Sequence, residues 1–388
     1  MPVTMALVEG YRSIRKLWTR LDGLNLVVGP NGCGKTNFHR ALGLLVEAAN
    51  GRLSRAVANE GGMPSLTWAG TRNPKDPVRV SVEVRFHDFT YALEMGLVTG
   101  SGQTLFLLDP QVKTERIELT GRRGRVVLLE RKGPSAWMRD ESGTRVSYPR
   151  ELSSSESVLG QLRDRHRWPE VSAIVDRVSG WRFYEHFRTD PDSPIRRPQV
   201  GLRTHVLAND GHDLASVMQT IREVGDEEAL EAAIDDAFPG ARLIVQSDAA
   251  VRVGVALQMP GIHRPLEARE MSDGTLRFLC LAGALLTPRP PELLALNEPE
   301  TSLHGRLLPA LARLVVRAAG TAQVLVTTHS RTLAGEIEAL SPGARTIALH
   351  LVQGETRVVD QRLVEDDEGT DGGTDGGDAD EADEDADA

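Results

Sequence analysis

The chain has 388 residues and a formal net charge of −10; 40% of its residues are hydrophobic and only two are cysteines. This length predicts one large domain or two, and two cysteines exclude a disulfide scaffold. No apolar run approaches the ~20 residues that cross a bilayer, and residues 1–5 carry no secretion signal, so we expect a cytoplasmic protein without a membrane partner.

The first motif follows an apolar strand. Residues 5–28 are predicted to form strands, and the last strand, residues 24–28, leads into a segment that fits G-x-x-x-x-G-K-[ST]. The segment consists of Gly29, Pro30, Asn31, Gly32, Cys33, Gly34, Lys35 and Thr36, and Asn37 opens a predicted helical stretch over 37–60.

Each part of this motif suits a bound phosphate. The glycines let the backbone turn its N–H groups inward, and the following helix adds the positive end of its dipole. Lys35 supplies a charge for the β- and γ-phosphates, and the Thr36 hydroxyl supplies a ligand for Mg²⁺. The sequence therefore predicts a P-loop that binds ATP or GTP, with Cys33 as a spectator thiol.

The middle of the chain changes character several times. Residues 78–98 alternate apolar and polar side chains as a half-buried strand does, and residues 104–148 alternate between turn signals, as in an antiparallel sheet. Helical spacing follows near 156–178 and over 213–237, on either side of a proline-rich loop, and residues 241–259 return to strand character.

A basic stretch runs through the predicted antiparallel sheet and beyond it. Acidic residues are interleaved with the cations, and Trp137 is the one obvious aromatic candidate for an exposed position. Two interpretations stay open, a solvated face and a nucleic-acid face. The cations are Arg122, Arg123, Arg125, Arg131, Lys132, Arg139, Arg145, Arg150, Arg163, Arg165 and Arg167.

A second anion site is predicted further along the chain. Ser272 and Gly274 open a helix, and the N-terminus of a helix attracts anions. Because the chain already has a P-loop, this site is expected to serve the nucleotide of another subunit.

Two apolar strands near the C-terminus are predicted to complete the nucleotide site. Residues 292–296 end in Asn297 and Glu298, and we expect this strand to lie beside the P-loop strand. Glu298 is then placed to orient or deprotonate the attacking water, and Asn297 to assist Mg²⁺. Residues 324–328 end in His329, which can hydrogen-bond the γ-phosphate or the water.

Residues 365–388 form an acidic tail. They hold 13 acidic residues and no basic ones, whereas the rest of the chain has 45 basic and 42 acidic residues. Without a hydrophobic period the tail cannot offset chain entropy, so we expect it to be disordered. It is either a solvating segment or an electrostatic mimic that competes with nucleic acid.

These motifs, in this order, resemble the ABC-type ATPase heads of RecF, SMC and OLD-like proteins, and above all the stand-alone ATPases described as AAA or RecF/RecN/SMC-domain proteins. Residues 9–14 resemble the opening strand of these heads, 29–37 their Walker A motif, 272–275 the signature motif, 297–300 the Walker B motif, 301–304 the D-loop, and 328–330 the switch histidine.

The resemblance implies an ATP- and Mg²⁺-dependent homodimer with two composite sites. Ser272 and Gly274 of one chain would contact the γ-phosphate that the other chain holds; ATP binding would close the dimer and hydrolysis would open it. Such heads work in DNA repair, chromosome maintenance and phage defence, which suggests DNA and a nuclease or other effector subunit as partners.

The chain also departs from the family pattern. Asn297 stands where the family has an aspartate, and a neutral ligand holds a metal-bound water less strongly than a carboxylate does. Gln103 is the candidate for the glutamine of the family's Q-loop. No acidic cluster like that of a Toprim nuclease follows the ATPase motifs, and no heptad pattern is long enough for coiled-coil arms.

The sequence leaves two interpretations open for several side chains. Tyr11 and Trp18 are candidates for stacking on adenine, and packing in the core is the alternative for each of them. Glu300 is a second base or, with more support, a D-loop residue at the dimer interface. His304 and His329 resemble a metal pair, although their motif positions explain each of them better.

We expect an α/β P-loop NTPase fold of the ABC/SMC-head type, with a mixed sheet, an antiparallel β subdomain and an inserted α/β middle region. The head would span residues 1–364, divided into an N-lobe (about 1–100), the middle region (about 101–240) and a C-lobe (about 241–364). The favoured function is an ATPase. Its rivals are an ATP-binding dimerisation switch with little hydrolysis and, with less support, the ATPase subunit of a transporter.

Overall fold

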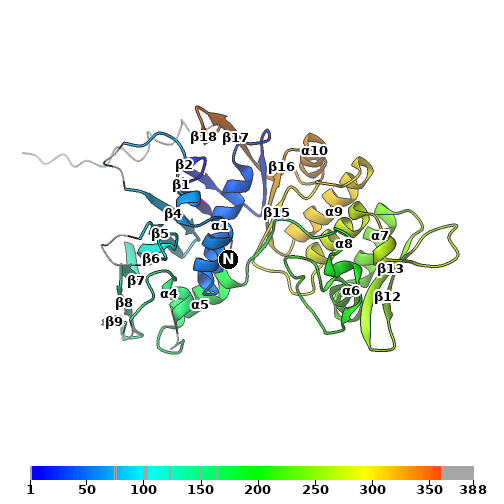
Figure 1. The fold of residues 1–388 in the computed structure, drawn as a ribbon, viewed down its shortest axis with the longest axis horizontal. Coiled ribbons are helices and arrows are strands. Elements are labelled where there is room, and N and C mark those ends of the chain that lie inside the picture. The colour runs from blue at the N-terminus through cyan, green and yellow to red at the C-terminus, as the bar shows by residue number, and fades with distance from the viewer. Residues whose placement is uncertain are drawn as a thin grey trace, which may run out of the picture.

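The computed structural model describes residues 2–73, 75, 77–98, 104–121, 124–148, 151–162 and 165–359. Figure 1 shows two lobes on either side of a central sheet. Several features of the sequence lie outside the described residues, namely Gln103, Arg122, Arg123, Arg150, Arg163 and the acidic tail.

The N-terminal lobe contains an antiparallel sheet of eight described strands. Its order is β2 (Ile14–Arg20), β1 (Met5–Tyr11), β4 (Arg79–Arg85), β5 (Phe89–Gly96), β6 (Gln111–Gly121), β7 (Gly124–Lys132), β8 (Ser135–Arg139) and β9 (Arg145–Ser147). The boundary expected near residue 100 falls between β5 and β6, which pair with each other through Tyr91 and Ile117. Residues 111–147 therefore extend the sheet of the N-lobe, because β6 continues the buried face of β5.

A mostly parallel sheet lies between the lobes. Its order is β10 (Arg182–Tyr184), β15 (Leu293–Asn297), β16 (Gln323–Thr328), β3 (Leu24–Val28), β17 (Arg345–Val352) and β18 (Glu355–Val358). The expectation that β15 lies beside the P-loop strand β3 is wrong, because β16 separates the two. Strands buried on both faces are apolar throughout, so their pattern does not reveal their order.

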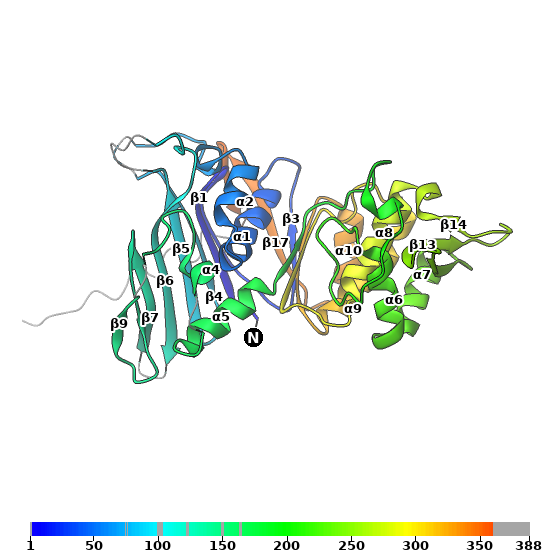
Figure 2. The same ribbon diagram turned by 60° about the horizontal axis from the view of Figure 1, so that its bottom comes forward.

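Alternate residues of the parallel strands face two different cores. In β15, Leu293 and Ala295 pack into the core that contains the helix after the P-loop, whereas Leu294 and Leu296 pack into the core of the other lobe. Figure 2 shows α1 (Lys35–Ala49) on one side of the sheet and α8 (Asp273–Leu285), α9 (Leu308–Ala319) and α10 (Arg331–Leu340) on the other.

The remaining elements complete the two lobes. The N-terminal lobe adds α2 (Leu53–Asn59), α3 (Met63–Leu66), α4 (Val158–Gln161) and α5 (Pro169–Ser179). The C-terminal lobe adds α6 (Leu214–Val224), α7 (Glu227–Ala237) and a small sheet of β11 (Gln199–Val200), β12 (Arg242–Ser247), β13 (Arg252–Gln258) and β14 (Leu266–Glu267).

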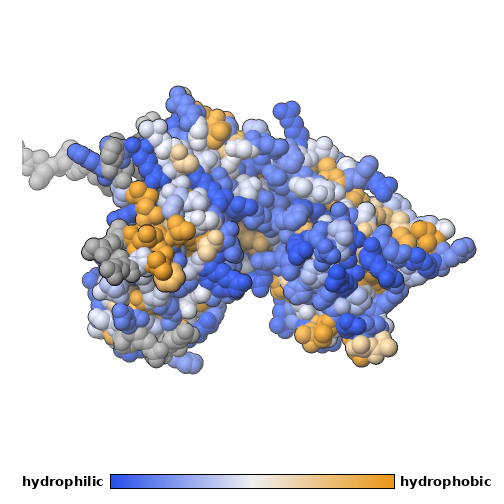
Figure 3. Space-filling model, viewed as in Figure 1, coloured by the Kyte–Doolittle hydropathy of each residue, from blue (hydrophilic) through white to orange (hydrophobic). Residues whose placement is uncertain are grey.

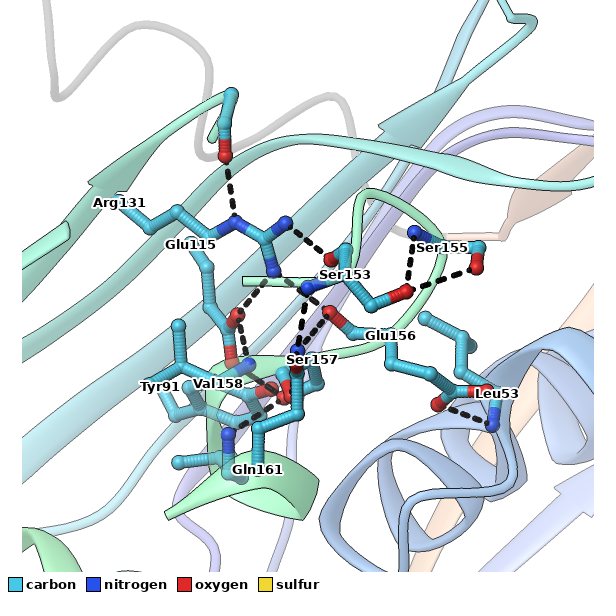
Figure 4. Close-up of polar contacts among 12 residues, drawn as sticks. Leu53, Tyr91, Glu115, Arg131, Ser153, Ser155, Glu156, Ser157, Val158 and Gln161 are labelled. Carbon is cyan, nitrogen blue, oxygen red and sulfur yellow. Dashed lines mark hydrogen bonds and ion pairs between the residues drawn. The ribbon is translucent and has the colours of Figure 1, made fainter. Parts of the chain in front are cut away.

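A buried ion pair ties the antiparallel sheet to the segment that precedes α4 (Figure 4). Arg131 and Glu115 are both fully buried, with Nη1 and Oε2 4.0 Å apart. Arg131 donates to the carbonyls of Ser153 and Glu156, and the Glu156 carboxylate accepts from the N–H of Leu53 at the start of α2. Burial raises the pKa of Glu115. Losing either charge would leave the other buried and unpaired, which is strongly destabilising.

The surface is mainly hydrophilic, with apolar patches on both lobes (Figure 3). One apolar run lies between β5 and β6, where residues 105–108 expose from 58% to 95% of their surface. Among the described residues, no helix combines the length and apolar character needed to cross a membrane.

Candidate functional site

The P-loop joins the end of β3 to the start of α1. Gly32 and Gly34 have positive φ angles of 80° and 104°, which side chains with a Cβ rarely adopt. A Cβ on Gly34 would also lie 2.1 Å from Thr356 Oγ1 on β18. Glycine is therefore required at position 34 for both backbone conformation and space.

Lys35 lies inside this loop and is 3% exposed. Its Nζ donates to the carbonyls of Gly29 (2.8 Å) and Pro30 (3.0 Å), and it lies 3.8 Å from Glu298 Oε1. The buried ammonium group therefore has two carbonyl partners within the loop and a carboxylate nearby, after β15. From this position it can also reach the oxygens of a phosphate bound at the loop.

The polar pair at the end of β15 has a constrained backbone. Asn297 is 9% exposed, and its Oδ1 accepts a hydrogen bond from Thr327 Oγ1 at 2.7 Å. Glu298 has a left-handed φ of 45°, an uncommon conformation for a residue with a side chain. Its N–H donates to the Thr327 carbonyl at 2.9 Å, so this hydrogen bond to β16 holds the turn in place.

His329 lies between two carboxylates. Its Nδ1 is 3.7 Å from Glu298 Oε1 and 3.3 Å from Glu300 Oε1. Glu300 Oε1 also accepts from Thr328 Oγ1 at 2.6 Å and from the His329 N–H at 3.0 Å. Since Glu300 is 8% exposed and bound to this turn, it holds the end of β16 and the start of α10.

The structure brings together Lys35 at the start of α1, Glu298 after β15 and His329 after β16. A groove of about 780 Å³ opens beside them, between the P-loop and α10. The groove is lined by Val28, Gly29, Pro30, Asn31, Thr328, His329, Ser330, Arg331, Ala334, Gly335, Glu338 and Thr346.

Asn37 connects the P-loop helix to the N-terminal sheet. Its Nδ2 donates to Ser13 Oγ at 2.8 Å, and Ser13 Oγ lies 2.8 Å from Thr356 Oγ1. Tyr11 on the preceding strand is fully buried and its hydroxyl donates to Glu60, so Tyr11 packs in the core and does not offer its ring to a base. This burial raises the pKa of Tyr11.

The signature segment lies on the other side of the parallel sheet from α1 (Figure 2). Ser272 is exposed, and its Oγ accepts from the Thr275 N–H at 3.1 Å, which caps α8. A Cβ on Gly274 would lie 2.7 Å from the Ser302 carbonyl, so only glycine lets the D-loop approach α8 this closely. The structure does not bring Ser272 and Gly274 to the P-loop of the same chain.

Three residues at this site were missed by the sequence analysis. Arg277 on α8 is 4% exposed, and its Nη2 donates to the Glu298 carbonyl at 3.1 Å. Glu185 and His186 follow β10, the strand beside β15; Glu185 Oε1 accepts from Arg40 Nε on α1 at 2.7 Å. For Arg277, the sequence does offer a signal, because it is an arginine inside the otherwise apolar run of residues 276–286.

The cations of the basic stretch have different surroundings. Glu118 pairs with Arg116 at 2.6 Å and lies 3.9 Å from Arg125, Lys132 pairs with Glu130, and Arg131 is buried. The Arg145 guanidinium instead lies 4.2 Å from the ring centre of Trp137. Most described cations of the strands are therefore neutralised within the sheet.

The described residues hold no cluster of three or more His, Cys, Asp or Glu side chains that could bind a metal ion. The donors near the P-loop that suit Mg²⁺ are the Thr36 hydroxyl and the Asn297 amide oxygen. These oxygens are hard ligands, and a single such site normally leaves most positions to phosphates and water.

The model of the family described as "AAA domain, putative AbiEii toxin, Type IV TA system" matches residues 140–334. The chain belongs to this AAA family. The matched segment contains the signature, Walker B and switch-histidine motifs, and begins after the P-loop. No curated protein matches the chain.

Two solved structures share the fold. An SmcHead bound to the C-winged helix domain of ScpA has 14% identity and a TM-score of 0.53, covering 92% of this chain and 98% of its own. An Smc head domain with an extended coiled coil, bound to the C-terminal domain of ScpA derived from Pyrococcus furiosus, has 14% identity and a TM-score of 0.52, covering 95% and 98%. The chain thus has a P-loop NTPase fold of the SMC-head type.

Proposed function

We propose that the protein binds ATP with Mg²⁺, hydrolyses it, and works as an ATP-dependent head-to-head dimer. The observation that carries this proposal is the convergence of Lys35 Nζ and His329 Nδ1 on Glu298 Oε1, at 3.8 and 3.7 Å. This convergence supports the proposed roles of Lys35 in binding phosphate, of Glu298 as the base and of His329 as the sensor.

In this proposal the triphosphate lies along the P-loop. Lys35 exchanges its carbonyl partners Gly29 and Pro30 for phosphate oxygens, and the N–H groups at the start of α1 bind the β-phosphate. Thr36 and, through water, Asn297 would hold Mg²⁺, and the bound ion would supply positive charge against the charge that develops on the phosphates.

Glu298 orients the attacking water and accepts its proton, and His329 donates a hydrogen bond to the γ-phosphate. Glu300 supports the second role, since its carboxylate lies 3.3 Å from His329 Nδ1 and orients the ring. With Nδ1–H facing Glu300, Nε2 donates to the γ-phosphate when the ring carries both protons. The left-handed backbone of Glu298 favours this assignment, because strained residues cluster at functional sites.

The second half of each site comes from another chain in this proposal. Ser272 and Gly274 stand at an exposed helix N-terminus, on the side of the sheet away from α1. Only a second head can bring such an N-terminus to the γ-phosphate of the first. ATP then acts as the bridge between the two heads.

Steady-state ATP hydrolysis of the wild type and Glu298→Gln tests this function. We expect turnover to fall by roughly 100-fold or more in the variant, because the base is lost while fluorescent ATP still binds. Glu141→Gln, on an exposed turn, is the matched control. Full turnover by Glu298→Gln would contradict the role of Glu298.

The dimer is tested with the same variant. Glu298→Gln should accumulate the ATP-bound dimer, so sedimentation velocity with ATP and Mg²⁺ should detect a species of twice the mass. A monomer at ATP concentrations that saturate the P-loop would contradict the dimer proposal.

The second candidate function is an ATP-binding switch with little hydrolysis. Asn297 favours it, because its amide is neutral and its Oδ1 already accepts a hydrogen bond from Thr327. Tight ATP binding by the wild type without turnover would support the switch over the ATPase.

A DNA-linked process is proposed from the fold, together with an effector subunit such as the ScpA domains found on the similar SMC heads. The candidate contact on this chain is the Trp137–Arg145 pair, where aromatic and guanidinium planes are available for stacking. ATP turnover with and without double-stranded DNA tests this; no effect at low salt would argue against it.

A further inference from the structure

Arg277 is a buried cation that forms no ion pair with the carboxylates of the described residues. Its Nη2 donates to the Glu298 carbonyl, and its Nη1 lies 3.0 Å from His186 Nδ1. Its Nε is buried and has no hydrogen-bond partner among the described residues, and the carboxylates of Glu300 and Glu298 act on this cation through their charge. Burial accordingly lowers the pKa of Arg277. Such a charge is expensive to keep inside a protein.

The carboxylate of Glu300 also has an oxygen without a hydrogen-bond partner among the described residues. Three of its neighbours bind one oxygen, Oε1, whereas Oε2 is buried without a partner. Glu300 follows Glu298 by two residues, and its charge acts on Arg277. Among the described residues, the site therefore holds a buried donor and a buried acceptor of opposite charge that lack partners, and a buried polar atom without a partner is destabilising.

Helix α8 meets the Walker B and D-loop segment at two points. In its first turns, Arg277 donates to the carbonyl of Glu298, and a Cβ on Gly274 would lie 2.7 Å from the carbonyl of Ser302. Ser272 lies at the start of the same helix, little more than one turn before Arg277. A shift of α8 caused by a contact at Ser272 must therefore act on Glu298.

We propose that Arg277 is a positioning residue with two alternative partners, the Glu298 carbonyl and the Glu300 carboxylate. The inference rests on the proposed function and deepens it. Engagement of Ser272 by a second head shifts α8 and transfers Arg277 from Glu298 to Glu300. Glu298 is then free to turn toward the water, and Glu300, neutralised by Arg277, holds His329 in place. The signature motif of a chain in this way reports to the hydrolytic site of the same chain.

The test is a double-mutant cycle of Arg277→Met and Glu300→Gln. Each single variant should lower kcat by roughly tenfold or more, because Glu298 and His329 lose their support, and the Kd for fluorescent ATP should change by less than about threefold. The double variant should be no slower than the slower single variant, since both remove one interaction. Arg277→Lys keeps the charge without the two-armed geometry and should retain part of kcat.

Thermal stability separates positioning from a structural role. Arg277→Met removes an unpaired buried charge, so its Tm should equal or exceed that of the wild type while kcat falls. Arg313→Met is the matched control, because Arg313 forms an ion pair with Asp236 elsewhere in the same lobe. Its kcat should equal that of the wild type.

Additive losses of kcat in the double variant would overturn the proposal, as would a kcat loss that a lowered Tm accounts for. A wild type without turnover contradicts the ATPase proposal instead, and the cycle is then measured on the ATP-dependent dimer dissociation constant in the Glu298→Gln background. Additivity there overturns the Arg277 proposal as well.

Discussion

The two halves of the candidate site are built in opposite ways. The P-loop half is buried and internally bound, since Lys35 has two carbonyl partners and the Glu298 carboxylate nearby. The signature half is an exposed helix start, where Ser272 binds within its own turn. The difference supports the proposal that one chain forms the phosphate-binding half by itself and presents the other half to a second chain.

The largest effect is expected from Lys35→Met, which removes the charge of the buried half. The Kd for ATP should rise by roughly 100-fold or more, because charge-assisted hydrogen bonds to phosphate are lost. Titration with fluorescent ATP measures this, with Lys16→Met on the exposed face of β2 as the control. An unchanged Kd would mean that the phosphates do not bind at the P-loop.

Ser272→Arg changes the outward half and should act at a different step. A large cation at the helix start blocks the approach of a second head, so ATP-dependent dimerisation in the Glu298→Gln background should weaken by about tenfold or more. ATP binding by the monomer should be unaffected, because Ser272 is remote from the P-loop of its own chain. Ser247→Arg is the control in the same lobe. If Ser272→Arg weakens ATP binding to the monomer, the division into two halves is wrong.

How much of this arrangement the sequence predicted depends on the range of the interaction. The P-loop and the strand ends at Glu298 and His329 were predicted because each motif is local and its geometry follows from a few adjacent residues. The order of the strands was not, because β15 and β16 are both buried and apolar, and nothing in either pattern says which lies beside β3.

The contact of Arg277 and the extent of the antiparallel sheet were not predicted, for the same reason. The apolar run around Arg277 predicts a buried helix whether or not the arginine reaches the Glu298 carbonyl, which is a contact across 21 residues of chain. Likewise, β5 and β6 pair with each other across the lobe boundary that the sequence pattern predicts near residue 100. The roles assigned to Ser272, Asn297 and Glu298 stay predictions.

The buried half should also be sensitive to acid. His39 on α1 is fully buried, and burial lowers its pKa to about 4, below its ordinary value of 6.5. The folded state therefore resists a proton that the unfolded chain accepts. As pH falls from 6.5 to 4, the free energy of unfolding should drop by up to about 3 kcal/mol, and no such loss occurs above pH 6.5.

Urea unfolding of the wild type and His39→Leu between pH 4 and 7 measures this contribution. The variant should lose most of the acid dependence that His39 causes, whereas His263→Leu, at an exposed position, should retain it. Equal pH dependence in wild type and His39→Leu would show that other groups cause the acid sensitivity.

The smallest effect is expected from Asn297→Asp, which adds a charge without changing shape. Thr327 Oγ1 can donate to an aspartate oxygen as it does to Asn297 Oδ1, so the turn before Glu298 is kept. The carboxylate strengthens the hold on a metal-bound water, so half-maximal turnover should occur at a lower Mg²⁺ concentration. If the natural protein is an ATPase, kcat should change by less than about tenfold; an increase of about 100-fold would identify it as a switch whose turnover Asn297 suppresses. Asn59→Asp, at the exposed end of α2, is the control for the added charge, and it should leave the Mg²⁺ dependence unchanged.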